Sequence, residues 1–156
     1  MSNITVKAFV HEDFVNYKKP SMFIAFPRCS FKCGREVCQN IGLQDVTDIP
    51  ISAEKIVSMY MHNPITKAIV IGGLEPFDSK EDLYTLIAEF RKHTQDTIVI
   101  YSGYTEEELK VDIEHLKKFS NILLKVGRYI PNRNKVYTPL LGVSLASDNQ
   151  YVIRIS

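Results

Sequence analysis

Residues 68–77 read Ala68-Ile69-Val70-Ile71-Gly72-Gly73-Leu74-Glu75-Pro76-Phe77, an apolar run that ends in a turn of glycine, glutamate and proline. An uninterrupted apolar run rich in β-branched residues is typical of a strand that is buried on both faces. Glycine and proline then end the strand, because glycine lets the backbone turn and proline cannot continue the ladder. The stretch therefore predicts an inner strand of a parallel sheet, followed directly by a turn.

Similar apolar runs recur on both sides of this stretch. They predict core strands at Met22–Phe26, Ala68–Ile71, Ile98–Tyr101 and Ile122–Leu124, with further strands at Ile4–Val10 and Tyr151–Ile155. Helical patterns lie between the middle strands, and the first of these helices should end before Asn63-Pro64. The caps expected for the three helices are Ser52, Ser79 with Asp82, and Thr105 with Glu108.

Strands that alternate with helices predict an α/β fold, which we expect to be a small, partial (β/α) barrel-like domain. Its sheet should be mainly parallel, with helices on the outer face. In such sheets ligands bind beyond the carboxyl ends of the strands, so the loops after Phe26, Ile71, Tyr101 and Leu124 should converge on one site. Residues 128–147, with Pro131 and Pro139, are interpreted as an irregular closing loop.

The composition describes one globular domain, and we expect residues 1–156 to form it. Of 156 residues, 45% are hydrophobic and 24% are charged, which is enough apolar material for a core. The formal net charge of +1 argues against nucleic acid as a ligand. The sequence has neither a signal-peptide pattern at its start nor an apolar run of about 18 residues, so we expect a cytoplasmic protein with no membrane contact.

The three cysteines, Cys29, Cys33 and Cys38, all lie in one short window after the strand Met22–Phe26. An odd number of thiols in a reducing compartment does not indicate disulfides, and their concentration in one loop indicates a metal. Three thiolates suit a 4Fe-4S cluster, which would keep one of its four irons free for chemistry. The sequence thus predicts an iron-sulfur cluster at the edge where ligands bind.

Two other interpretations of the cysteines stay open. One is a structural zinc site completed by one of the four histidines, although none stands at a zinc-ligand spacing from the cysteines. The other is a set of inert core cysteines, which the charged residues between them disfavour. The histidines are His11, His62, His93 and His115.

The turn Gly72-Gly73-Leu74-Glu75 is a candidate ligand site, because bare backbone carbonyls and one carboxylate can bind an ammonium group. Taken alone, however, the same residues are ordinary turn chemistry. Ser102 is equally ambiguous, as a cofactor contact or as a turn residue before Gly103.

Taken together, these features resemble the radical S-adenosylmethionine superfamily, and most closely the activating component of anaerobic (class III) ribonucleotide reductase. The resemblance runs through most of the chain in the family's order. The segments that carry it are 13–16, Cys38-Gln39-Asn40, Gly72-Gly73-Leu74-Glu75-Pro76, Tyr101-Ser102-Gly103-Tyr104-Thr105, Gly127-Arg128-Tyr129 and Ser147-Asp148-Asn149-Gln150.

The chain departs from the family's pattern at three places. The family has three and then two residues between its cysteines, whereas this chain has three and then four. Leu74 stands in place of a further glycine, and Val126 stands where the family carries an aspartate.

The resemblance implies that the cysteines hold a 4Fe-4S cluster and that S-adenosylmethionine is cleaved beside it to methionine and a 5′-deoxyadenosyl radical. It implies Val37, Gln39, Gly72, Gly73, Glu75 and Ser102 as the cofactor-binding residues. The implied substrate is a glycine of anaerobic ribonucleotide reductase, and the implied electron donor is a flavodoxin-like protein. Another glycyl-radical enzyme, a small-molecule substrate, or a non-catalytic iron-sulfur or zinc module are the alternatives.

Overall fold

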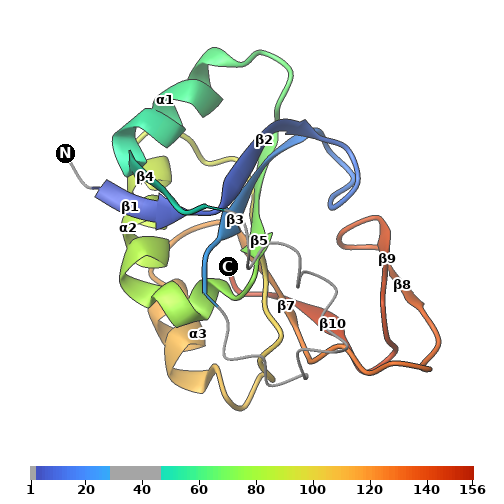
Figure 1. The fold of residues 1–156 in the computed structure, drawn as a ribbon. Coiled ribbons are helices and arrows are strands. Elements are labelled where there is room, and N and C mark those ends of the chain that lie inside the picture. Colours follow the sequence, from blue (N-terminus) through green and yellow to red (C-terminus); the bar gives the residue numbers. More distant parts are fainter. Residues whose placement is uncertain (1–2, 29–46) are drawn as a thin grey trace.

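The computed structural model describes residues 3–28 and 47–156, and its centre is a six-stranded sheet in the order β10-β7-β6-β5-β3-β2 (Figure 1). The four inner strands are parallel, and each edge strand pairs antiparallel with its neighbour. The six strands are β2 (Ala8–Asp13), β3 (Ser21–Phe26), β5 (Ala68–Gly73), β6 (Ile98–Tyr101), β7 (Ile122–Val126) and β10 (Tyr151–Arg154).

The inner strands lie where the apolar runs predicted them, which confirms an α/β fold with a mainly parallel sheet. The strands β5 and β7 each continue two residues further than predicted, to Gly73 and Val126. The barrel-like part of the prediction is not confirmed. The described strands form an open sheet whose two edges, β2 and β10, do not pair with each other.

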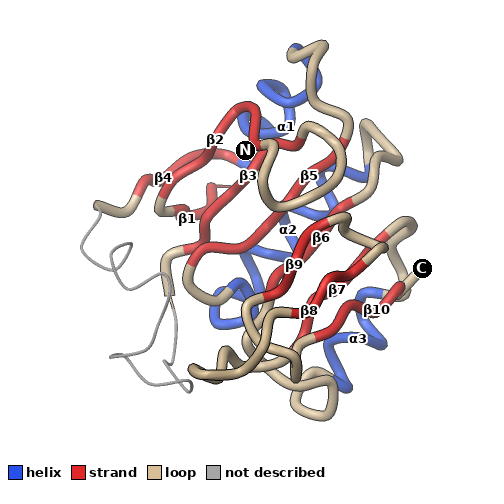
Figure 2. The backbone as a smooth tube through the Cα atoms, turned by 90° about the vertical axis from the view of Figure 1, so that its right-hand side faces the viewer, coloured by secondary structure: helices blue, strands red, loops and turns tan. Residues whose placement is uncertain are grey.

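Three helices cover one face of the sheet (Figure 2). They are α1 (Ala53–His62), α2 (Lys80–Arg91) and α3 (Lys110–Leu116), and a short 3-10 turn, η3 (Pro76–Ser79), precedes α2. Apolar side chains of the sheet and the helices interlock here, and Ile24, Ile71, Phe90 and Leu124 are completely buried. Within residues 3–28 and 47–156, no helix has the length and apolar character needed to cross a bilayer.

The helix caps follow the sequence prediction only in part. The Ser52 hydroxyl caps α1 as predicted, and this helix ends before Asn63. The prediction for α2 is wrong, because the Ser79 side chain makes no cap hydrogen bond. Its expected partner, Asp82, instead accepts a hydrogen bond from the Thr5 amide at 3.0 Å. Asp82 is therefore used to hold the N-terminal segment, and the spacing of a capping box at Ser79 forms no cap.

The third predicted capping box is confirmed, but it does not begin an α-helix. The amide of Thr105 donates to the Glu108 carboxylate at 2.9 Å, and the amide of Glu108 donates to the Thr105 hydroxyl at 3.2 Å. The chain turns for several residues before α3 begins at Lys110.

The opposite face of the sheet is covered by residues that were predicted to be irregular. Within 128–147 lie β8 (Val136–Thr138) and β9 (Val143–Leu145), which pair as an antiparallel hairpin. Leu141 and Leu145 are buried in a second apolar cluster with Val70 and Val99 of the sheet. Strands of three residues beside proline give little periodicity, and it is the packing on the sheet that stabilises them.

The N-terminal segment forms two strands instead of the single strand predicted at Ile4–Val10. The first strand, β1 (Asn3–Val6), pairs with β4 (Ile49–Ser52) outside the main sheet, and the second is β2. The break falls at Lys7, whose amide donates to the Ala25 carbonyl at 2.7 Å. Its buried ammonium forms an ion pair with Asp48 at 2.7 Å. A buried cation is stabilised by such a partner. Lys7 therefore stands as a charged residue between the two strands, where the sequence prediction had one continuous strand.

Candidate functional site

The carboxyl ends of the parallel strands meet at one edge of the sheet, as predicted. The register places Ala25 beside Gly72, Phe26 beside Gly73, and Tyr101 beside Lys125. The loops that follow these strands therefore begin next to one another, and hydrogen bonds join them.

The turn after β5 is bonded to the start of the segment that carries the cysteines. The amide of Leu74 donates to the Phe26 carbonyl at 3.2 Å, and the amide of Glu75 donates to the Arg28 carbonyl at 2.6 Å. Arg28 immediately precedes Cys29 in the sequence. The two motifs that the sequence singled out are thus neighbours at their described ends.

The two glycines of the turn differ in what the fold demands of them. Gly73 has φ +93°, and a Cβ there would lie 2.6 Å from the Phe26 amide nitrogen. Only glycine fits this position, because both the backbone conformation and the close approach of β3 exclude a side chain. A Cβ on Gly72 would face the Phe23 ring at 3.3 Å and Tyr101 Cβ at 3.5 Å. Packing of the strands thus accounts for Gly73 without a ligand.

Glu75 is the most constrained polar residue at this edge. Its side chain accepts hydrogen bonds from the Gly103 amide at 2.7 Å, the Ser102 hydroxyl at 2.9 Å and the Phe77 amide at 3.2 Å. The residue is only 4% exposed, and burial raises the pKa of its carboxyl group to about 7 against the opposing effect of these donors. The carboxyl group joins the turn after β5 to the turn after β6, and its pKa lies near physiological pH.

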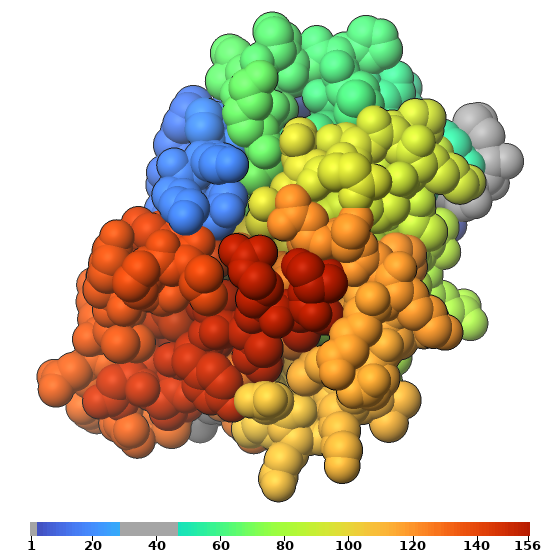
Figure 3. Space-filling model, turned by 180° about the vertical axis from the view of Figure 1, so that it is seen from behind, coloured from blue at the N-terminus to red at the C-terminus, as the bar shows by residue number. Residues whose placement is uncertain are grey.

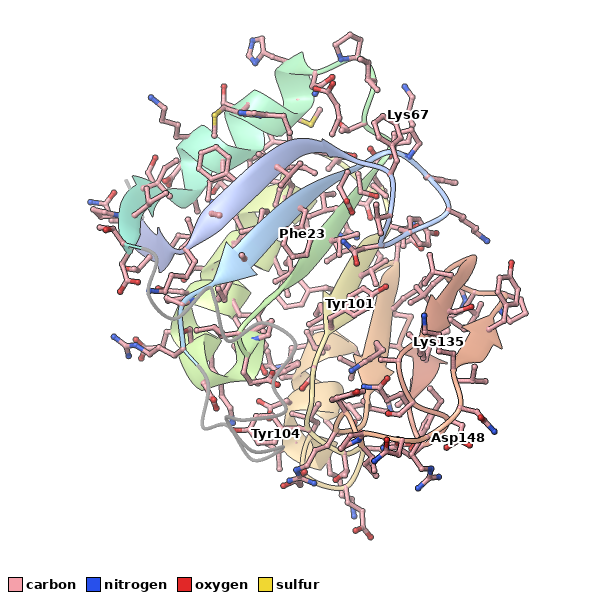
Figure 4. All side chains as sticks on the ribbon, turned by 45° about the vertical axis from the view of Figure 1, so that its right-hand side comes forward. Phe23, Lys67, Tyr101, Tyr104, Lys135 and Asp148 are labelled. Atoms are coloured by element: carbon pink, nitrogen blue, oxygen red, sulfur yellow. The ribbon has the colours of Figure 1, made fainter. Side chains whose placement is uncertain are left out.

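The segment Ser102-Gly103-Tyr104 connects three of the strand ends. The Ser102 hydroxyl donates to Glu75 and accepts from the Tyr104 amide at 3.0 Å. The Tyr104 phenol donates to Asp78 at 2.5 Å, and the Tyr104 carbonyl accepts from the Gly127 amide at 2.8 Å. Figure 4 shows Tyr104 at this edge, with Tyr101 higher on the sheet. Within the described residues, Ser102 therefore positions Glu75.

Lys125 is a site residue that the sequence analysis missed. It is 7% exposed, and its ammonium donates to the carbonyls of Ser102 at 2.9 Å and Gly127 at 3.2 Å. A buried lysine is uncommon, and here it places a positive charge in the network that holds Glu75. The sequence signal that could have identified it is a single lysine inside the otherwise apolar run Ile122–Val126. By contrast, Val126 is fully buried in the core beneath the helices and supplies no polar contact.

A cavity of about 560 Å³ opens beside this edge, on the side of β1 and α2. This volume is within the range of small-molecule sites. Both cations and carboxylates line it, so it suits a ligand that carries charges of both signs. Its lining residues are Thr5, Pro27, Arg28, Phe77, Asp78, Ser79, Lys80, Glu81 and Asp82.

The remaining predicted site residues lie outside the described part of the chain. They are Cys29, Cys33, Cys38, Val37 and Gln39. The four histidines of the zinc alternative are described, and they lie on β2, at the end of α1, after α2 and on α3. In residues 3–28 and 47–156, no three histidine, cysteine or acidic side chains gather in a way that could hold a metal ion.

A family model described as the 4Fe-4S single cluster domain matches residues 21–153. The chain belongs to this family. The searches of curated proteins and of solved structures gave no match. The matched range contains all three cysteines and runs from β3 into β10, so the whole parallel sheet belongs to the 4Fe-4S single cluster domain.

The donor set of this 4Fe-4S domain fits the cluster that its family name states. Cysteine thiolates are the usual protein ligands of such clusters, and the sequence has three, all within ten residues of one another. The described residues include no cysteine, and the polar groups that meet at this edge, among them the carboxylate of Glu75, the hydroxyl of Ser102 and the ammonium of Lys125, include no histidine.

Proposed function

We propose that this iron-sulfur protein is a radical S-adenosylmethionine enzyme that generates a glycyl radical on anaerobic ribonucleotide reductase. One observation carries the proposal: the hydrogen bond from the Glu75 amide to the Arg28 carbonyl. It joins the turn expected to receive S-adenosylmethionine to the residue before the first cysteine of a 4Fe-4S domain. Cofactor cleavage requires this proximity between ligand and cluster.

Cys29, Cys33 and Cys38 would hold the cluster. Three protein ligands for four irons leave one iron with an open position, which the amino and carboxylate groups of S-adenosylmethionine would fill. By resemblance to the family, Val37 and Gln39, which flank Cys38, would lie beside the cofactor.

Glu75 fits the amino group of this ligand. Its carboxylate has capacity for about four hydrogen bonds and accepts three within the described chain, of which only one reaches Oε1. Burial disfavours its ionised form, as the pKa of about 7 records. A ligand ammonium would offset that cost, so cofactor binding and ionisation of Glu75 should support each other.

Lys125 adds the complementary charge. Its ammonium is fixed by the carbonyls of Ser102 and Gly127, next to the group that holds Glu75. A carboxylate and an ammonium in one hydrogen-bond network match the zwitterionic methionine part of the ligand. By resemblance to the family, the turn of Gly72 and Gly73 would lie beside the ligand's amino group.

The cluster, once bound and reduced, would supply the one electron that divides S-adenosylmethionine into methionine and a 5′-deoxyadenosyl radical. The proposed outcome is transfer of a hydrogen atom from the α-carbon of a glycine in the partner, which would give 5′-deoxyadenosine and a glycyl radical. A flavodoxin-like protein would supply the electron. The chain's own residues orient the ligand and exclude water from it.

The choice of substrate rests on the order of motifs that this chain shares with activating proteins of anaerobic ribonucleotide reductase. Two of those motifs, the Gly-Gly-Leu-Glu-Pro turn and the Tyr-Ser-Gly-Tyr segment, contact each other through Glu75 and Ser102. We propose further that residues 1–156 act as one domain.

Anaerobic reconstitution with iron and sulfide, then reduction with S-adenosylmethionine present, tests the chemistry. We expect methionine and 5′-deoxyadenosine in equal amounts. Addition of the reductase should give an organic radical whose electron paramagnetic resonance doublet collapses when the reductase contains glycine deuterated at the α-carbon. Product formation without this radical would reject the substrate and favour a small molecule. Tight binding of one zinc without uptake of iron would reject the chemistry.

A further inference from the structure

The face of the sheet opposite the helices presents an exposed apolar loop. Phe14 and Val15, in the connection between β2 and β3, are 67% and 74% exposed. On the neighbouring strand β8, Tyr137 is 63% exposed. Large apolar side chains that are exposed together in one patch commonly mark a protein interface. Aromatic residues often contribute most of the binding energy of such an interface.

This loop is held in place on both sides of its apolar tip. Asp13 accepts hydrogen bonds from the Val15 amide at 3.4 Å and from the Asn16 amide at 3.2 Å. The Asn16 side chain donates to the same carboxylate at 3.0 Å. Tyr17 is buried in the apolar cluster beneath the β8–β9 hairpin. Phe14 and Val15 therefore point outward from an ordered turn, which reduces the entropy lost when a partner binds.

The loop and the hairpin form one continuous surface. A Cβ on Gly142, in the turn between β8 and β9, would lie 2.7 Å from Lys18 Cβ, so the two backbones are closely packed. Figure 3 shows the blue segment that contains the loop against the orange segment that contains the hairpin. We name this surface, made of Phe14, Val15, Lys18, Lys19, Lys135 and Tyr137, the loop–hairpin surface.

The loop–hairpin surface is positively charged. Lys18, Lys19 and Lys135 are exposed, and within the described residues none of them forms an ion pair. The nearest acidic residue in the loop, Asp13, is occupied by its own turn. A partner that covers this surface should therefore carry an apolar recess surrounded by carboxylates.

A single hydrogen bond connects this surface to the proposed site. The Tyr101 phenol, at the end of β6, donates to the Asn16 carbonyl at 2.6 Å. The next residue, Ser102, holds Glu75. Figure 4 shows Phe23 and Tyr101 on the open face of the sheet. A protein bound to the loop–hairpin surface would cover the open face that carries Tyr101, and it would have to extend from there along the sheet to the carboxyl edge.

We propose that the loop–hairpin surface is where the protein substrate docks, and that the substrate meets it with an acidic, partly apolar face. This inference rests on the proposed function, since it takes the substrate to be a protein. Apolar contacts with Phe14, Val15 and Tyr137 provide the affinity, and the three lysines steer the acidic partner toward the site.

The test measures binding of the reconstituted enzyme to purified anaerobic ribonucleotide reductase from the same genome. Two sets of substitutions are made, Phe14→Ser with Val15→Ser, and Lys18→Glu with Lys19→Glu and Lys135→Glu. The matched control combines Val111→Ser and Lys118→Glu, which lie in exposed positions on and after α3. Melting temperatures establish that each variant folds.

We expect each set to raise the dissociation constant at least about tenfold, and the lysine set also to flatten its dependence on salt. The control should bind as the wild type does. All variants should form 5′-deoxyadenosine from S-adenosylmethionine at the wild-type rate when no partner is present, because neither set touches the cofactor network.

Equal binding by the wild type and by both sets would overturn the proposal, as would absence of any complex with the wild type. Loss of self-association, or loss of binding to the electron donor alone, would assign the surface to a second copy or to the donor and equally overturn it. Failure of the proposed function has a separate signature. If the wild type forms no 5′-deoxyadenosine but its binding to the reductase still depends on these residues, the docking surface stands and the radical chemistry is rejected.

Discussion

The carboxyl group of Glu75 should make the stability of this protein depend on pH. Its pKa is 4.5 in the unfolded chain and about 7 in the folded protein, because burial disfavours the ionised form. Between these two values the folded state holds a proton that the unfolded state has lost. Unfolding therefore becomes easier as the pH rises from about 4.5 to about 7, and the dependence on this group ends above that range.

The size of the effect follows from the shift. A difference of one pKa unit corresponds to roughly 1.4 kcal/mol, so the shift from 4.5 to about 7 predicts a loss of about 3 kcal/mol in the free energy of unfolding. Glu75→Gln removes this titration. Glutamine keeps one acceptor oxygen but loses the second, so one of the three donors around it becomes unsatisfied at a cost of about 1–3 kcal/mol at every pH.

Urea unfolding at several pH values between 5 and 8, without S-adenosylmethionine, measures both the pH-dependent loss of stability in the wild type and the pH-independent cost of the substitution. The difference in stability between wild type and Glu75→Gln should be largest near pH 5 and should decrease toward pH 7. Glu107→Gln, at an exposed glutamate, is the control and should reproduce the wild-type curve. Parallel curves for wild type and Glu75→Gln would refute the argument, because they would show that burial does not perturb this carboxyl group.

Three further predictions concern the cluster, the ligand and the turn. Replacement of any one of the three cysteines by alanine should abolish binding of about four irons per chain, measured by iron and sulfide analysis; retention of the cluster in all three variants would contradict the ligand assignment. Glu75→Gln should weaken S-adenosylmethionine binding by one charged hydrogen bond, about 1.5–3 kcal/mol, and leave the cluster spectrum intact; an unchanged dissociation constant would limit Glu75 to joining the two turns. Gly73→Ala should destabilise the fold by at least roughly 1–3 kcal/mol, since its φ is +93° and a Cβ would meet backbone at 2.6 Å. Gly103→Ala, whose Cβ would lie 3.6 Å from Glu75 Oε1, should cost less in thermal unfolding, and equal losses would contradict the packing argument.

The local sequence pattern was enough to predict the inner strands of the sheet. Each inner strand is buried on both faces, so its residues form a continuous apolar run that needs no partner to be recognised. The cap at Ser52 and the stop at Asn63-Pro64 are equally local, since they depend on one side chain and one ring. Convergence of the strand-end loops followed from the parallel order alone.

The hairpin β8–β9 and the division at Lys7 could not be predicted in this way. The three-residue strands are stabilised where Leu141 and Leu145 pack on the sheet, and the ion pair with Asp48 at 2.7 Å helps to keep Lys7 in the interior. The spacing from Ser79 likewise predicted Asp82 as part of a capping box. In the fold, Asp82 instead accepts a hydrogen bond from the Thr5 amide. In each case a contact between distant residues overrides the local preference.

The sequence by itself determined that three cysteines lie within ten residues after the strand Met22–Phe26, and it predicted a loop there at the carboxyl edge of a parallel sheet, because spacing and strand order are properties of the chain. Only the tertiary structure decided how the polar groups of that edge are used. Glu75 accepts three hydrogen bonds, from Phe77, Ser102 and Gly103. The side chain of Lys125, within the apolar strand β7, donates to the carbonyls of Ser102 and Gly127. Desolvation and hydrogen bonding act through distance, so the pKa of Glu75 and the burial of Lys125 arise only when these segments meet.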